Sequence, residues 1–351
     1  MTETVLQYLK RHWKLLLNIV TVGVLVIIVF SIHNELITTF KNLTRVHAWI
    51  LLLMIPIEMY NYHAQTKLYE GLFKLVGNKV KYKLLYKTAL ELNFINSVFP
   101  SAGISGVSYF GMRLRSDKIS GTKAAVVQML KLVLILLSFE ILLIIGVFIM
   151  AVGGHINDIT IAVASSLSTL MVVGTFAGMM ILSEKRRIDA TVAFVTRLIN
   201  KIIHIIRPKH PETISAEHWR HSAQELHDNY VIIKSNYKEL KQPLIYATLA
   251  NLTEVLAIYV VYGAFGHWVN IGAIILAYAV ANFAGLVSVL PGGIGVFEAL
   301  MTAVLAAAGI PISLSIPVTV MYRVLNTIIQ IPPGYYFYHR ALQAKSVKET
   351  G

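Results

Sequence analysis

Long apolar stretches are the feature that most constrains this chain. Four of them run for about 18 residues or more with at most two charged side chains: Leu15–Ile32, Ala124–Met150, Leu244–Phe265 and Ile271–Leu290. A stretch of this length spans a bilayer as a helix, because a helix satisfies all its backbone hydrogen bonds internally. Only 14% of the residues are charged and 56% are apolar, which excludes a soluble enzyme. We therefore expect an all-α polytopic membrane protein.

The basic residues predict its topology. The net charge of +13 comes from Lys and Arg that flank the apolar runs, such as Lys10, Arg11 and Lys14. Such residues are retained on the cytoplasmic side, so both termini are expected there. No Lys or Arg stripe alternates with aromatic side chains, and no direct nucleic-acid partner is expected. About six spanning helices are predicted, near residues 15–32, 46–65, 124–150, 159–182, 244–263 and 313–338.

Two apolar segments, 84–115 and 271–309, are interrupted by proline and glycine, and the second of them includes the run Ile271–Leu290. The breaks are Pro100-Ser-Ala-Gly-Ile-Ser-Gly106 and Pro291-Gly-Gly-Ile-Gly295. Basic residues flank the first segment at both ends and are absent from both ends of the second. We expect two re-entrant hairpins that enter from opposite faces, as in an inverted repeat, with a transporter's binding site between them. The alternative is that each break is a kink in a spanning helix.

The whole chain, 1–351, is expected to form one integral membrane domain. Within it, the loop 183–243 carries 11 Lys or Arg and 7 Asp or Glu, which predicts a cytoplasmic location. Apolar residues recur there every three or four positions from Ile188 to Ile206, with basic residues between them, so this part is expected to form an amphipathic helix on the inner leaflet. With no cysteine and no tight histidine spacing, no metal site is expected.

Polar side chains inside apolar segments are the candidates for a substrate site. An ionisable group at the bilayer centre costs about 2.5–3.5 kcal/mol, so such groups usually face a cavity or one another. The candidates are Glu58, Glu91, Asn96, Lys131, Glu140, Glu254, Asn282, Glu298, Arg323 and Asn326. The alternative is that some of them reach the membrane interface or only hold helices together.

The two breaks supply a second kind of candidate. A helix that begins inside the membrane presents free N–H groups and partial positive charge, which suit a phosphate. The residues concerned are Pro100, Gly103, Gly106, Pro291, Gly292, Gly293 and Gly295. These glycines are equally typical of close helix packing. No nucleophile–base arrangement or nucleotide-binding loop is present, so no catalytic residue and no cofactor are expected.

The break motifs also carry a family resemblance. Leu290-Pro-Gly-Gly-Ile-Gly-Val-Phe-Glu298, with Tyr322-Arg323 downstream, and Pro100–Gly106, followed by Tyr109 and Arg113, resemble the lysylphosphatidylglycerol synthase transmembrane-region family. That family forms the membrane half of the bacterial multiple peptide resistance factor. The chain departs from it at Ile104 and Ser105, since many relatives have an acidic residue near Gly103.

The resemblance implies a flippase-like protein of the bacterial cell membrane that handles aminoacylated phospholipids, such as lysyl-phosphatidylglycerol, and contributes to cationic peptide resistance. A headgroup phosphate would meet Arg323, and a cationic group would meet Glu298 or Glu254. Full-length relatives add a C-terminal lysyltransferase domain, which is not expected here because the chain ends 13 residues after Tyr338. The alternatives are a phosphatidylglycerol lysyltransferase, or its membrane subunit, and a non-transporting scaffold. The expected partners are phospholipid, a separate aminoacyl-lipid synthase and a second copy of the chain.

Overall fold

The computed structural model describes residues 46–98, 104–117, 119–154, 156–184, 235–287 and 295–349, with a few isolated positions elsewhere. Over these residues the chain is helical and contains no strand, which confirms the all-α expectation. The helices are α3 Ala48–Leu51, α4 Met54–Leu75, α5 Tyr82–Val98, α6 Ile104–Leu114, α7 Gly121–Val152, α8 Asp158–Ser183, α11 Lys241–Ala264, α12 Ile271–Val287, α13 Val296–Ala307 and α14 Ile312–Glu349. The predicted helix 15–32 and most of the loop 183–243 lie outside the described residues.

Four helices are long and apolar enough to cross a membrane within the described part of the chain. They are the segments Lys123–Val152, Asp158–Ala177, Tyr237–Ala264 and Ile312–Gln343, in α7, α8, α11 and α14. They coincide with four of the six predicted spans. The multi-pass membrane class is thereby supported by length and composition.

Helix α4 differs from its predicted range of 46–65. It runs to Leu75, because the helical hydrogen bonds continue through the polar stretch that contains Lys67 and Glu70, an ion pair one turn apart at 2.7 Å. Its composition is also more polar than that of the four spanning segments. The reason is that Glu58 and Asn61 are buried inside the molecule and do not meet lipid.

Two pairs of short helices occupy the predicted hairpin segments. Helix α5 packs on α6, and α12 packs on α13. At 1.5 Å per residue, even the 17-residue helices α5 and α12 are only about 25 Å long, short of a hydrocarbon core of about 30 Å. Residues 99–103 and 288–294, which include both break motifs, lie outside the described residues.

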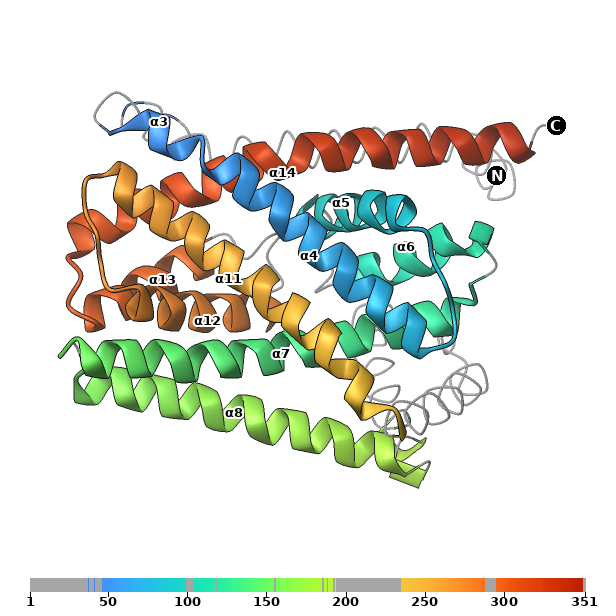
Figure 1. The fold of residues 1–351 in the computed structure, drawn as a ribbon, viewed down its shortest axis with the longest axis horizontal. Coiled ribbons are helices and arrows are strands. Elements are labelled where there is room, and N and C mark those ends of the chain that lie inside the picture. Colours follow the sequence, from blue (N-terminus) through green and yellow to red (C-terminus); the bar gives the residue numbers. More distant parts are fainter. Residues whose placement is uncertain are drawn as a thin grey trace, which may run out of the picture.

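The two halves of the chain have the same order of elements, a long helix, a short pair and a long helix. In the first half these are α4, α5, α6 and α7, and in the second α11, α12, α13 and α14. Helix α4 packs against its counterpart α11, while α7 packs on α12 and α14 packs on α5 (Figure 1). Exchanging the halves leaves this set of contacts unchanged, as an inverted repeat requires.

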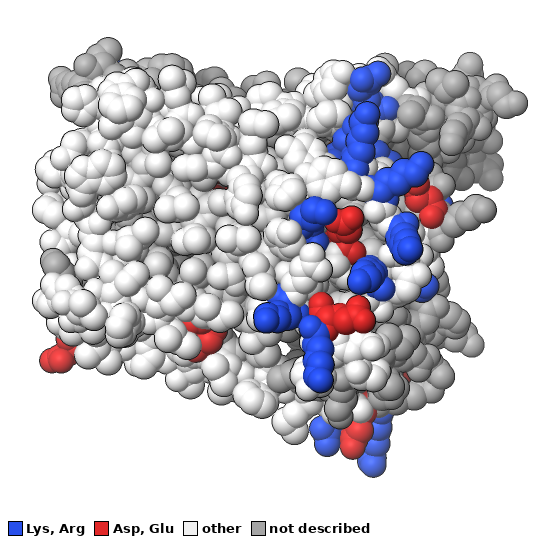
Figure 2. Space-filling view, viewed as in Figure 1, with Lys and Arg blue, Asp and Glu red and all other residues white. Residues whose placement is uncertain are grey.

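The two short pairs lie toward opposite ends of the molecule. Figure 1 shows α5 and α6 in the right half of the view and α12 and α13 in the left half. In the same orientation, Lys and Arg side chains gather in the right-hand part of the visible face (Figure 2). The first pair therefore lies at a basic end, and the second pair lies at the end where this face shows few basic groups.

Candidate functional site

A polar network lies at the junction of α4, α11 and α14, and Glu254 is at its centre. The Tyr322 hydroxyl donates to Glu254 Oε2 at 2.7 Å, and Asn326 Nδ2 lies 3.4 Å from the same oxygen. On the other side, Asn61 Nδ2 donates to Glu254 Oε1 at 3.2 Å and also to the Thr253 hydroxyl at 2.8 Å. One carboxylate thus ties together three helices from both halves of the chain.

The network continues to Glu58 and to the first short pair. Gln330 Nε2 donates to Asn326 Oδ1 at 2.6 Å and to Glu58 Oε2 at 2.9 Å. Gln330 Oε1 accepts from Asn93 Nδ2 of α5 at 2.7 Å, and Asn93 also donates to the Tyr62 hydroxyl at 2.9 Å. Asn93 was not among the sequence candidates. The sequence did offer a sign of its role, because Asn93 is a polar residue in the same predicted hairpin arm as Glu91 and Asn96.

At its other end the network reaches Lys131 of α7. Gln65 Nε2 donates to Asn61 Oδ1 at 2.6 Å, and Lys131 Nζ donates to Gln65 Oε1 at 3.3 Å and to the Tyr69 hydroxyl at 3.0 Å. Lys131 of α7 and Tyr322 of α14 are each the eleventh residue of their helix. Each contacts the long helix of its own half, α4 or α11, so the repeat places different chemistry at equivalent positions.

Beside the network, Arg323 of α14 and Glu298 of α13 form an ion pair. Arg323 Nε lies 3.0 Å from Glu298 Oε1, and the side chains are 22% and 15% exposed. The guanidinium group also lies over the Phe297 ring, 4.7 Å from its centre, which adds a cation–π contact. Both side chains of the pair are therefore mostly buried and partly exposed.

The start of α13 positions Glu298. Gly295 is the N-cap with φ of 85°, a left-handed conformation that favours glycine. Its N–H donates to Glu298 Oε2 at 2.7 Å, as in a capping box. One carboxylate oxygen thus caps the helix while the other pairs with Arg323.

Other candidates lie apart from this network. Glu91 is buried within the first short pair, where it accepts from Tyr109 and Arg113 of α6, both at 2.8 Å. Glu140 of α7 contacts the Ser168 hydroxyl of α8. Asn251, which is three residues before Glu254, contacts Ser138 of α7, so these two side chains of α11 have different neighbours.

The remaining candidates are explained by packing or are not described. A Cβ atom added to Gly106 would collide with the Asn96 side chain, so this glycine allows α5 and α6 to approach closely. Asn282 lies beside the hydroxyl group of Tyr278. Pro100, Gly103, Pro291, Gly292 and Gly293 lie outside the described residues. Over the described residues, no group of three His, Asp or Glu side chains could hold a metal ion.

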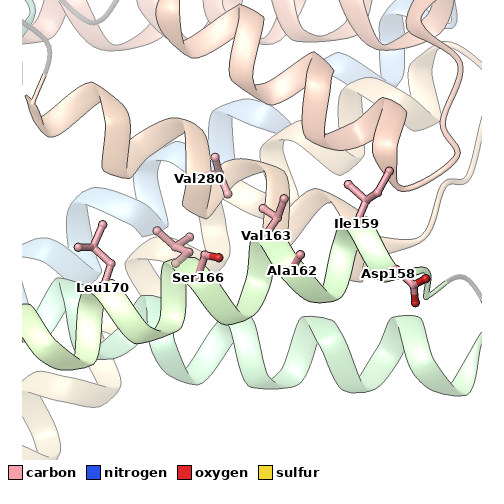
Figure 3. A pocket seen from close by; sticks show the side chains of 8 residues that line it. Asp158, Ile159, Ala162, Val163, Ser166, Leu170 and Val280 are labelled. Atoms are coloured by element: carbon pink, nitrogen blue, oxygen red, sulfur yellow. The ribbon is translucent and has the colours of Figure 1, made fainter.

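A groove of about 610 Å³ lies on the outer surface between α8 and α12. Figure 3 shows Ile159, Val163 and Leu170 of α8 facing Val280 of α12, with Ser166 between them and Asp158 at one end. Its lining is apolar except at those two positions. It is suited to an apolar chain and not to a charged headgroup.

The helices, the apolar surface and the buried polar network together define a multi-pass membrane protein with a charged centre shared between two repeats. The family follows from comparison with known proteins. The chain matches the model of the lysylphosphatidylglycerol synthase TM region over residues 15–334, and it belongs to this family.

Two relatives are UPF0104 membrane proteins. One, from Methanothermobacter thermautotrophicus, is 33% identical over 92 residues, which cover 26% of this chain and 28% of that protein. The other, from Pyrococcus horikoshii, is 20% identical over 239 residues, which cover 66% of this chain and 69% of the relative. No solved structure matches the chain.

Proposed function

We propose that this protein moves phospholipids with charged headgroups between the two leaflets of a membrane. The observation that carries the proposal is the pair of opposite charges, Arg323 and Glu298, held at 3.0 Å beside a buried network that joins both repeats. An isolated charge at membrane depth is costly. A pair of opposite charges that is also partly exposed therefore indicates a functional site.

The ion pair offers complementary groups to a headgroup. Arg323 suits a phosphate, since a guanidinium group can donate two parallel hydrogen bonds to its oxygens. Glu298 suits a cationic group, such as the ammonium of an aminoacylated lipid. With no lipid bound the two side chains neutralise each other. A headgroup with one phosphate and one ammonium group would replace the Arg323–Glu298 pair with two ion pairs, one to each side chain. Its entry therefore leaves neither side chain without an opposite charge.

The apolar groove between α8 and α12 supports a lipid as the substrate. Its walls, which include Val163, Leu170 and Val280, can pack against an acyl chain that stays in the bilayer while the headgroup crosses. The two short helix pairs at opposite ends supply elements that could open toward either leaflet in turn.

The basic end is proposed to face the cytoplasm of a bacterial cell, as the positive-inside rule predicts. Lys67 and Lys74 lie in the last part of α4 and Lys87 lies in the first part of α5, and Figure 1 shows both parts at this end. On this arrangement α5 and α6 approach from the cytoplasmic face and α12 and α13 from the external face.

The direct test is a leaflet-resolved lipid assay in proteoliposomes. Purified protein should accelerate the exchange of fluorescent lysyl-phosphatidylglycerol between leaflets, read by its loss to a membrane-impermeant quencher. Arg323→Gln should reduce this rate by about tenfold or more, because 1.4 kcal/mol of lost phosphate binding corresponds to a factor of ten. Exchange no faster than in protein-free vesicles would contradict the proposal.

A deletion strain separates translocation from synthesis. If the protein translocates lipid, the modified lipid should still be made but remain in the inner leaflet. Complete loss of the modified lipid would instead favour the lysyltransferase alternative.

A further inference from the structure

Glu58 is a buried carboxyl group with incomplete hydrogen bonding. Its side chain is 1% exposed, and Oε2 accepts from Gln330 at 2.9 Å. Its other oxygen, Oε1, has no hydrogen-bond partner among the described residues. A charged carboxylate inside a membrane protein needs donors or a cation to offset the loss of water. Glu58 lacks part of that compensation.

Glu254 is the second carboxyl group of the same network, and it is better compensated. It accepts from Asn61, Tyr322 and Asn326 within the described chain. The positive charge of Arg323 also acts on it, while its own negative charge acts on Glu58. Two like charges in one buried site are not both favoured. Glu58 has fewer hydrogen-bond donors than Glu254, so of the two carboxylates it is the one whose negative charge is more favourably neutralised.

Among the described residues, no other group supplies a cation in contact with Glu58. The side chains that interact electrostatically with Glu58 include Tyr62 of α4, Tyr278 of α12 and Tyr322 of α14, and a phenol group cannot carry a positive charge. Lys131 of α7 is connected only through Gln65 and Asn61, which lead to Glu254. The smallest ligand that completes the site is a proton.

We propose that Glu58 is a proton-binding site and that its occupancy drives the first short pair, α5 and α6, during lipid translocation. Binding forms one O–H bond on the carboxylate, with the proton supplied by a hydronium ion that becomes water, and it removes one negative charge from the network. The site itself follows from the network alone. Its link to transport rests on the translocation function proposed above.

Gln330 provides the mechanical connection. Its amide nitrogen donates to Glu58, and its amide oxygen accepts from Asn93 of α5. A hydrogen bond to a charged carboxylate is roughly twice as strong as one to a neutral group. Protonation of Glu58 weakens its hold on Gln330, and with it the contact from α14 to α5. The proton thus shifts the balance between two arrangements of the first short pair.

The proton site can be tested without transport. Infrared difference spectra of the purified protein in nanodiscs, taken between mildly acidic and mildly alkaline pH, should contain a carboxylic acid C=O band that is absent from Glu58→Gln. The control is Glu70→Gln, on the same helix but 40% exposed and paired with Lys67, and it should keep the band. If Glu58→Gln is poorly folded, Glu58→Asp serves instead and should shift the band. A spectrum unchanged by either Glu58 variant overturns the proposal.

The coupling is tested in proteoliposomes with and without a pH gradient. The wild-type protein and Glu70→Gln should translocate lipid at a rate that depends on the gradient, and Glu58→Gln should translocate at a rate that does not. A wild-type rate that is measurable but independent of the gradient overturns the coupling and leaves translocation intact. If no condition gives translocation while the infrared band is present, the proposed function fails, the coupling fails with it and the proton site stands.

Discussion

The Glu298 side chain caps a helix and also takes part in the ion pair of the candidate site. Its Oε2 caps the Gly295 N–H at the start of α13, and its Oε1 pairs with Arg323. Carboxylates are favoured at the first turn of a helix by about 0.3–1 kcal/mol when exposed. A structural role alone would therefore account for an acid here, and a substitution that removes charge but keeps the cap can separate the two roles.

Glu298→Gln is expected to fold normally and to lose transport. Glutamine can also accept from the N-cap N–H, so the thermal midpoint should stay close to that of the wild type. Without its charge, Glu298 can neither balance Arg323 nor bind a cationic headgroup, and the translocation rate should fall about tenfold or more, equivalent to 1.4 kcal/mol. Abundance, thermal midpoint and the leaflet assay provide the measurements.

Glu298→Ala is the matched comparison. It removes the cap as well as the charge, so it should also lower stability by about 0.3–1.5 kcal/mol. If Glu298→Gln is abundant and fully active, the carboxylate is structural only, and Glu298 does not belong to the substrate site.

At the scale of the helices, α14 connects the two short pairs, which are the parts that would move during the proposed transport. Through Arg323 it contacts α13 of the second short pair, and through Gln330 it contacts α5 of the first. These residues are seven positions apart, so they lie about two turns from each other on one side of the helix. One turn after Gln330, α14 approaches α5 so closely that a Cβ at Gly334 would lie 2.7 Å from the Leu90 carbonyl oxygen.

Gly334→Ala is expected to destabilise the protein. The nearest atoms to the new methyl group, the Leu90 carbonyl oxygen and Phe94 Cβ, belong to or adjoin the backbone of α5 and cannot rotate away. Overpacking of this kind typically costs about 1–3 kcal/mol. The thermal midpoint in detergent should fall accordingly.

Gly174→Ala is the control. Gly174 lies on the exposed face of α8 with no atom within 4 Å of an added Cβ. Alanine is a better helix former than glycine by about 0.8–1 kcal/mol, so this variant should be as stable as the wild type or slightly more stable. Equal behaviour of the two variants would show that α5 and α14 are not packed tightly.

For the whole molecule, the contacts between the two halves and the charge distribution both agree with the predicted inverted repeat. The contacts of α7 with α12 and of α14 with α5 are exchanged by the repeat, and the two short pairs lie toward opposite ends. Basic side chains gather at the end that holds α5 and α6 (Figure 2). This arrangement makes the orientation in the membrane testable with single cysteines.

Ser313→Cys and Lys83→Cys should react from opposite sides. Both positions are exposed, one near the start of α14 and the other near the start of α5. In intact cells an impermeant thiol reagent should label Ser313→Cys, and it should label Lys83→Cys only after permeabilisation. The wild-type chain has no cysteine and is the unlabelled control. Labelling of both variants in intact cells would refute the proposed topology.

The sequence alone was sufficient for the class of the protein and for most of its helices. Long apolar runs without charge have one stable form in a bilayer, so Ala124–Met150 predicted α7 to within a few residues. The proline and glycine breaks at Pro100 and Pro291 predicted two re-entrant hairpins. Short helices occupy both segments, and the re-entrant arrangement itself stays a prediction. Arg323, Asn326 and Gln330 are spaced three and four residues apart, and this spacing predicts that they share one side of α14.

Which polar groups meet was decided only by the tertiary structure. Helical spacing shows that Asn61 and Glu58 share a face, but not that Asn61 meets Glu254 while Glu58 meets Gln330. Asn251 and Glu254 are three residues apart and yet contact different helices. Asn93 was visible in the sequence as a polar residue of its arm, but nothing in the sequence shows that it meets Gln330. These outcomes depend on how helices distant in the chain are packed, and each helix presents neighbours that its own periodicity does not contain.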